Sequence, residues 1–284
     1  YTVDPTSLAL TDVAQLKAPL AEGGHTHSVV FHVLTSDYNQ TALVTTPVLV
    51  ETHPNGDVNY EPSPLEVRVF YPDSGEMRLL QNHAQWPQGR FGHSVVKVGE
   101  TVVVVGGFNT TRDTVRRIHV FTDMWRLDLH GLDSTEPWSC GPIESTFADI
   151  FCSVPLTAAC KIRGSVSRFC GPQLLSVSLT GSTSITRGVF DDPLDSKVMN
   201  WDAAVSVGPF ICLFGSPEED EGTHCVYMYD IVSGDSTQFM PLSFPDKVMS
   251  ACMLNPTTML VVQRERTLVV ELDPQLFERF TDAD

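Results

Sequence analysis

The feature that most constrains the fold is a pattern of short apolar runs and glycines between residues 90 and 129. Four valines at 102–105 form a run that ends in the pair Gly106–Gly107. A polar stretch comes next. It is followed by a segment containing Met124 and Leu127, in which apolar residues alternate with other residues. β-Branched runs bounded by glycine are typical of strands, and so is the two-residue alternation. The pattern predicts neighbouring strands joined by turns.

The same arrangement recurs along the chain. Runs rich in Val, Leu, Ile, Phe and Tyr alternate with clusters of Gly, Pro, Asp and Ser, and helical spacing is limited to residues 8–20 and 274–280. The first strands of successive units lie about 66, 64, 45 and 47 residues apart. In the template unit we expect strands at 93–98, 101–107 and 124–129. Each of the other four units has three expected strands, which are 27–30, 42–50 and 65–71; 157–164, 165–171 and 174–179; 202–208, 210–215 and 226–230; and 249–254, 259–262 and 268–272. Fourth strands are expected at 77–80, around Trp138 and at 236–242.

The template unit resembles the kelch repeat. Its motif has an Arg/Gly-His-Ser start, which corresponds here to Arg90 followed by Gly92-His93-Ser94, then a strand closed by Gly-Gly and an aromatic-bearing strand. The resemblance implies an all-β fold, a kelch-like β-propeller of four-stranded antiparallel blades. The other units keep one glycine of the pair or none. A propeller is a scaffold, so the resemblance leaves the function open.

The resemblance also implies a single propeller domain over residues 1–284. Its approximate blades are 1–21 (an outer half-blade), 22–88, 89–150, 151–198, 199–246 and 247–284. Six blades are favoured, with one incomplete at the N-terminus, because kelch propellers usually have six or seven. Five blades are the alternative, in which residues 8–16 complete the blade of 249–272 and remove its exposed edge.

Composition and charge narrow the classes of function. The chain has 284 residues, of which 42% are hydrophobic, so it can bury a large core. Its 35 acidic residues against 18 basic ones give a net charge of −17, which repels nucleic acid and anionic membrane surfaces. We find no apolar run of eighteen residues and no signal peptide. We therefore expect neither a nucleic acid nor a membrane among the partners.

The cysteines favour a reducing environment. There are seven, without a Cys-x-x-Cys pair, which argues against a structural zinc site. Cys160, Cys170, Cys212, Cys225 and Cys252 lie within apolar runs, where a free thiol packs as a small hydrophobic group. The expected location is intracellular, cytoplasmic or nuclear. Two glycosylation tripeptides, at Asn39 and Asn109, change this expectation little.

Motifs for catalysis are missing from the sequence. It contains no Gly-x-Ser-x-Gly, no His-Glu-x-x-His and no phosphate loop, and no helix pattern follows Gly106–Gly107 as dinucleotide binding requires. His25 and His27, with His32 nearby, could ligate a metal, but His27 matches the position of His93 and is interpreted as structural. We expect no catalytic residue, no metal and no cofactor.

Polar loops remain as candidate binding elements. An arginine-bearing loop follows Gly107, an acidic run lies at 218–221 and an insert lies at 51–64, each between the second and third strands of its unit. The candidate partner-binding residues are Arg112, Arg116, Arg117, Arg90, Glu218, Glu219 and Glu221. Arginine suits carboxylate and phosphate recognition because its planar fork can donate two parallel hydrogen bonds. Trp138 and Trp201 are interpreted as packing residues.

We therefore expect a non-catalytic scaffold for protein interaction, a part of a larger complex. It would bind an acidic or phosphorylated protein or peptide through loops on one face. The alternative is the propeller domain of an enzyme, either a metal-dependent oxidase or an appended domain of a modifying enzyme such as a methyltransferase.

Overall fold

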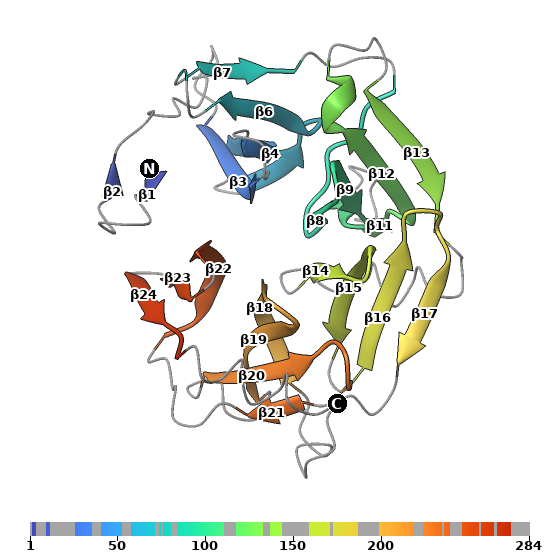
Figure 1. Cartoon of the computed structure of the whole chain (residues 1–284). Helices are drawn as coiled ribbons and strands as arrows, with labels where there is room; N and C mark the ends of the chain where they lie inside the picture. The colour runs from blue at the N-terminus through green and yellow to red at the C-terminus, as the bar shows by residue number, and fades with distance from the viewer. Residues whose placement is uncertain are drawn as a thin grey trace. The chain divides into compact units, whose positions relative to one another are not determined.

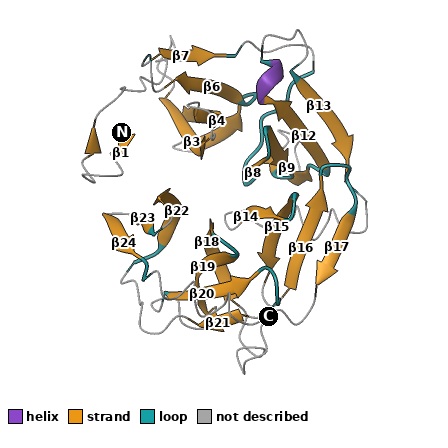
Figure 2. Cartoon of the chain, in the orientation of Figure 1, coloured by secondary structure: helices purple, strands orange, loops and turns teal. Residues whose placement is uncertain are grey.

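The computed structural model consists almost wholly of β-strands (Figure 2). It describes residues 2–3, 10–11, 26–35, 41–52, 58–71, 74, 76–80, 85–110, 118–132, 137–143, 159–170, 173–186, 199–217, 224–234, 236–238, 246–255, 257–263 and 266–273. Within these residues the only helical element is a 3-10 turn, η1, at Leu129–Gly131. No helix in this part of the chain has the length and apolar character needed to cross a bilayer.

The chain forms two compact units, which we describe separately. Unit 1 comprises Tyr1–Asp12, Thr157–Ser176 and Ser184–Asp284, and unit 2 comprises Val13–Leu156 and Val177–Thr183. Every strand pairing described in either unit is antiparallel.

Unit 2 contains two large sheets and a separate hairpin (Figure 1). The first sheet has the order β3-β4-β6-β7, with β5 paired to β4, and the second has the order β13-β12-β9-β8. The strands of the first are β3 (Thr26–Thr35), β4 (Thr41–Thr52), β5 (Val58–Pro62), β6 (Glu66–Tyr71) and β7 (Glu76–Leu79). Those of the second are β8 (Ser94–Val98), β9 (Thr101–Val105), β12 (Asp123–Asp128) and β13 (Trp138–Pro142), and the hairpin is β10 (Phe108–Thr110) with β11 (Ile118–Val120).

Unit 1 repeats this arrangement of strands in chain order. Its sheets have the orders β14-β15-β16-β17, β18-β19-β20-β21, β22-β23-β24 and β1-β2, and the end of β16 and the start of β17 belong to the Val177–Thr183 segment of unit 2. Their strands are β1 (Thr2–Val3), β2 (Leu10–Thr11), β14 (Ala159–Ile162), β15 (Ser165–Cys170), β16 (Gln173–Ser178), β17 (Thr183–Thr186), β18 (Met199–Val207), β19 (Phe210–Pro217), β20 (Cys225–Asp230), β21 (Ser236–Gln238), β22 (Val248–Asn255), β23 (Thr258–Gln263) and β24 (Thr267–Glu271).

The strands agree closely with those expected from the apolar runs, including all three strands of each unit. Four strands were missed: β5, β10, β11 and β17. They are short or polar, so they lack the apolar runs on which the prediction rests. Leu10–Thr11, which lies within the stretch of helical spacing at 8–20, is a strand. The rest of that stretch and residues 274–280 lie outside the described residues.

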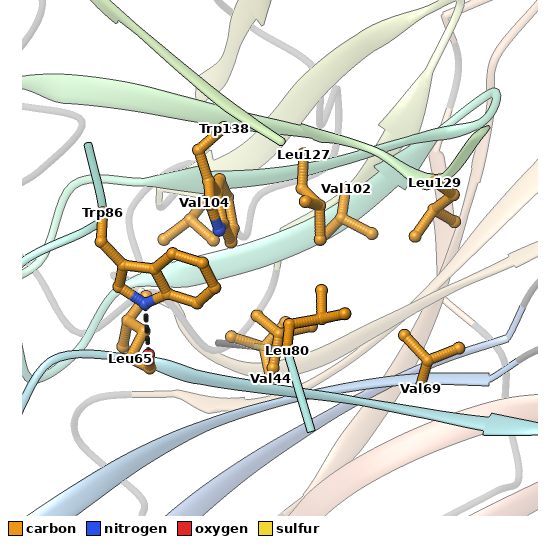
Figure 3. Packing of buried hydrophobic residues seen from close by; sticks show 11 residues of the cluster. Val44, Leu65, Val69, Leu80, Trp86, Val102, Val104, Leu127, Leu129 and Trp138 are labelled. Atoms are coloured by element: carbon orange, nitrogen blue, oxygen red, sulfur yellow. Dashed lines mark hydrogen bonds between the residues drawn. The ribbon is translucent and has the colours of Figure 1, made fainter. Parts of the chain in front are cut away.

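The core of unit 2 lies between its two large sheets (Figure 3). All four valines at 102–105 are fully buried, which explains why β9 is a continuous apolar run and not an alternating one. The indole of Trp86 packs edge-on against Trp138 and donates a hydrogen bond to the carbonyl of Leu65. This cluster covers the face of β9 that carries Val102 and Val104.

Unit 1 has two corresponding cores. One joins β14–β16 to β18–β20 and includes Phe169, Trp201 and Tyr229, and the other joins β18–β20 to β22–β23 and includes Phe214 and Met259. Trp138 is buried in the core of unit 2, and Trp201 is buried in the first of these two cores of unit 1. Their burial confirms the interpretation of both as packing residues.

Candidate functional site

The glycine pair of the template unit has a structural role. Gly106 and Gly107 have φ angles of 64° and 93°, a region that L-residues with side chains rarely adopt. A Cβ on Gly107 would lie 2.7 Å from the carbonyl oxygen of Phe91. Phe91 and Phe108 exchange two backbone hydrogen bonds of 2.8 Å across this point. The pair therefore lets the chain after β9 approach the segment before β8.

Arg90 occupies the centre of this structure and is fully buried. Its guanidinium donates to both carboxylate oxygens of Asp123, at 2.5 and 3.1 Å, and to the carbonyl of Gly106 at 3.0 Å. It also lies 4.1 Å from the ring centre of Phe121. The guanidinium is thus satisfied inside the unit, and Arg90 cannot present it to a partner. This corrects the expectation that Arg90 is a binding residue.

The loop that carries the three arginines is part of a hairpin. β10 and β11 pair with the register Phe108↔Val120, Asn109↔His119 and Thr110↔Ile118. Arg112, Arg116 and Arg117 lie in the sequence between these strands and are outside the described residues. The side chain of Ile118 is 67% exposed, and His119 is exposed with its ring 4.9 Å from that of Phe121.

The insert at 51–64 also contains strand structure. β4 continues to Thr52, and β5 pairs back along it from Val58 to Pro62. β5 lies against β10, and Gly89 packs so tightly on the carbonyl of Pro62 that no side chain could fit there. β5 and β10, the first described strands of the second-to-third-strand connections in the two sheets of unit 2, therefore lie side by side.

Within the described residues, none of the other candidate site residues is seen to lie beside this hairpin. Glu218, Glu219 and Glu221 lie outside them, as does His25. His27 and His32 are in β3, opposite Leu49 and Val44. Within the ranges that the structure describes, no group of three or more His, Cys, Asp or Glu side chains could hold a metal ion.

The described cysteines are all free thiols. Burial raises the pKa of Cys160 and of Cys212 to about 12. Cys252 and Cys140 are exposed, so Cys252 does not pack inside as its apolar run suggested. Desolvation, and next the negative charge of Asp123, raise the pKa of Cys140. Cys140, Cys160 and Cys212 therefore lack the lowered pKa that a catalytic nucleophile needs.

Two polar contacts were missed at the sequence level. Arg126 of β12 donates a hydrogen bond to the carbonyl of Leu179, and Lys247 pairs with the buried carboxylate of Asp202 at 2.7 Å. No local pattern indicates them, because the partners lie far apart in the chain.

Comparisons with known proteins bear on the fold. No protein-family model matches the chain, and no curated protein matches it. Among solved structures, the chain is similar to one described as "Structure of YjhT", a kelch-type propeller. The TM-score is 0.52 at 13% identity, over 88% of this chain and 75% of that chain. The likeness concerns the fold alone. The chain is an all-β protein of antiparallel sheets, and its fold is consistent with a propeller.

Proposed function

We propose that the chain is a kelch-type propeller that binds a partner protein and has no chemistry of its own. The observation that carries this proposal is the contact between strands of two second-to-third-strand connections in unit 2. Both contain strands, and β5 lies against β10. The described strands of these two connections offer a fixed surface, and loops held by a rigid scaffold commonly carry binding.

The partner that fits this surface is an acidic or phosphorylated protein or peptide. Arg112, Arg116 and Arg117 lie in the connection between β10 and β11, in a chain whose net charge is −17. Such a local excess of arginine favours carboxylate or phosphate groups. The acidic residues Glu218, Glu219 and Glu221 stay candidates for a second contact. We also propose an intracellular location, cytoplasmic or nuclear, which the free described thiols support.

For the architecture we propose six blades, one of them incomplete in this chain. The sheets β3–β7, β8–β13, β14–β17, β18–β21 and β22–β24 would be five blades, and β1–β2 would be the outer part of the sixth. The alternative of five blades requires β2 to pair with β24.

The test of the binding proposal is capture of partners from a cell extract by the full chain, read by mass spectrometry. Reversing the charge at Arg116 and Arg117 (R116E/R117E) should abolish capture of an acidic partner. The matched control reverses two exposed basic residues elsewhere, Arg78 and Lys161 (R78E/K161E), and should retain it. Capture that is unchanged in R116E/R117E would refute the proposal.

A further inference from the structure

We infer that Lys247 is a modification site that acts as a charge switch in unit 1. Acylation of its ε-amine loosens the contact between the sheet β18-β19-β20-β21 and the sheet β22-β23-β24. The inference does not depend on the proposed binding surface, which lies in unit 2. It rests on an ion pair whose two members differ sharply in their exposure to solvent.

The ion pair joins Lys247 to Asp202. The ε-amine of Lys247 lies 2.7 Å from Oδ1 of Asp202. The side chain of Asp202 is 6% exposed, whereas that of Lys247 is 57% exposed. In the described part of the chain, no other cation or hydrogen-bond donor pairs with this carboxylate. A buried negative charge thus depends on an amine that other molecules can reach.

Asp202 lies at an irregularity in β18. The pairing of β18 with β19 shifts between Trp201 and Ala203, so Asp202 is an extra residue in a β-bulge. A bulge redirects the side chain that it carries. Ala203 and Val248, which directly follow the two members of the ion pair, are both buried in the core between the two sheets. The ion pair therefore lies at the border of that core.

The backbone before Lys247 is fixed to its own sheet. Gln263, at the end of β23, is buried and donates a side-chain hydrogen bond to the carbonyl of Asp246. Its amide oxygen accepts a hydrogen bond of 2.8 Å from Nε of Arg266. Because β18 lies against β22 without sharing a sheet with it, the Lys247 side chain links one sheet to the other.

Loss of the Lys247 charge leaves the carboxylate of Asp202 buried and unpaired. Removing one member of such a pair is strongly destabilising, because a buried charge without a partner is costly. The unpaired charge favours any conformation that admits water to the carboxylate. Separation of the two sheets at the ion pair is the opening that does so. The exposure of Lys247 means that its charge can be removed without prior unfolding.

Acylation is the modification that removes this charge. The donor is an acyl thioester. The ammonium of Lys247 loses a proton, the amine nitrogen attacks the carbonyl carbon of the thioester, and the carbon–sulfur bond breaks. The products are a neutral amide, a thiol and one proton released to solvent. Methylation keeps the charge and should leave the two sheets in contact.

Two buried thiols report on the cores of unit 1 separately. Cys212 lies in the core between β18–β20 and β22–β23, and Cys160 lies in the core between β14–β16 and β18–β20. In the experiment, Nε-acetyl-lysine is genetically encoded at position 247 of the full chain, and iodoacetamide labelling is followed by peptide mass spectrometry. Cys212 should react about tenfold or more faster than in the unmodified chain, and Cys160 should change by less than about twofold.

Three controls test whether charge is the cause. K247R keeps the charge and should react as the unmodified chain does. Lys161 is exposed and pairs with no carboxylate among the described residues, so acetyl-lysine there should change Cys212 labelling by less than about twofold. In D202N, acetylation at position 247 should also have less than about a twofold effect, because asparagine has no charge to leave unpaired.

A second measurement tests access to the amine. The N-hydroxysuccinimide ester of acetic acid is added to the folded, unmodified chain. Lys247 should be acetylated at a rate within about tenfold of that of Lys161, because an ion pair with an exposed member slows such a reaction only modestly. A Lys247 that reacts only after unfolding is not a modification site, and the inference is then wrong.

The labelling experiment can also overturn the inference. Unchanged labelling of Cys212 in the acetylated chain contradicts it, and so does an equal effect in D202N. A parallel rise at Cys160 indicates unfolding of unit 1 as a whole and contradicts a switch at this contact. These outcomes are independent of partner capture by R116E/R117E, which tests the surface in unit 2.

Discussion

Gly107 and Arg90 show how single residues of the template unit act together. The positive φ of Gly107 brings the chain after β9 against Phe91, and the buried guanidinium of Arg90 joins that turn to Asp123 at the start of β12. The motif that led to the kelch resemblance is therefore a structural device at the base of the β10–β11 hairpin.

Substituting Gly107 by alanine should lower the free energy of unfolding by about 3 kcal/mol. The alanine would adopt an unfavourable φ and place its Cβ 2.7 Å from the carbonyl oxygen of Phe91. Gly99 is the matched control, since it also has a positive φ but nothing within 4 Å of the added Cβ. G99A should cost about 1 kcal/mol. Urea unfolding measures both, and equal losses would show that the contact with Phe91 is unimportant.

Substituting Arg90 by methionine should cost about 3 kcal/mol of unfolding free energy, because the Asp123 carboxylate and the Gly106 carbonyl lose their partner. The control is Lys97, whose amine pairs with Glu100 at 3.3 Å near the surface. K97M should change stability by about 0.5 kcal/mol or less. A comparable effect of the two substitutions in urea unfolding would contradict the role assigned to Arg90.

Thiol alkylation tests the raised pKa values. At pH 8, a thiol with a pKa of about 12 is about 0.01% thiolate, so Cys160 and Cys212 should react with iodoacetamide only after unfolding. Cys140 and Cys252 are exposed and should react first. Mass spectrometry of peptides after timed labelling gives the order. Early labelling of Cys160 or Cys212 would show that unit 1 opens readily and exposes its buried thiols.

At the level of elements, each strand is stabilised by the faces it buries. β9 is enclosed on both faces, while β24 alternates between exposed and half-buried residues along its length. The difference matters for substitutions. A side chain lost from an enclosed position leaves a cavity, whereas one lost from an outer strand is replaced by water.

Truncating Leu127 of β12 to alanine should therefore lower the unfolding free energy by about 3 kcal/mol, since this side chain is fully buried. Leu79 of β7 is the control, with a side chain that is 49% exposed. L79A should cost about 1 kcal/mol or less. Thermal or urea unfolding compares them, and similar losses would place Leu127 outside the core of unit 2.

At the level of the whole molecule, the strand count of the last sheet decides the architecture. The sheet β22-β23-β24 has three strands among the described residues, and β24 pairs only with β23. The six-blade arrangement leaves β1–β2 to another blade, and the five-blade arrangement joins β2 to β24. Neither changes the surface formed by β5 and β10–β11, which lies within unit 2.

A cross-linking experiment separates these arrangements. In T11C/V269C, six blades predict no disulfide between β2 and β24 under oxidising conditions, because the two strands do not pair. The positive control is R68C/L79C, at opposite positions of the described β6–β7 ladder. Peptide mass spectrometry detects the bond. A disulfide in T11C/V269C with the yield of the control would instead establish five blades.

The sequence alone determined the strands, because strand formation depends on local alternation and on turn residues. Every predicted triplet of strands was found, whereas β5, β10 and β11 lack a strong apolar run and were missed. Tertiary structure decided the roles of polar residues. Arg90 was expected to bind a partner, yet it is fully buried against Asp123, which lies 33 positions away in the sequence.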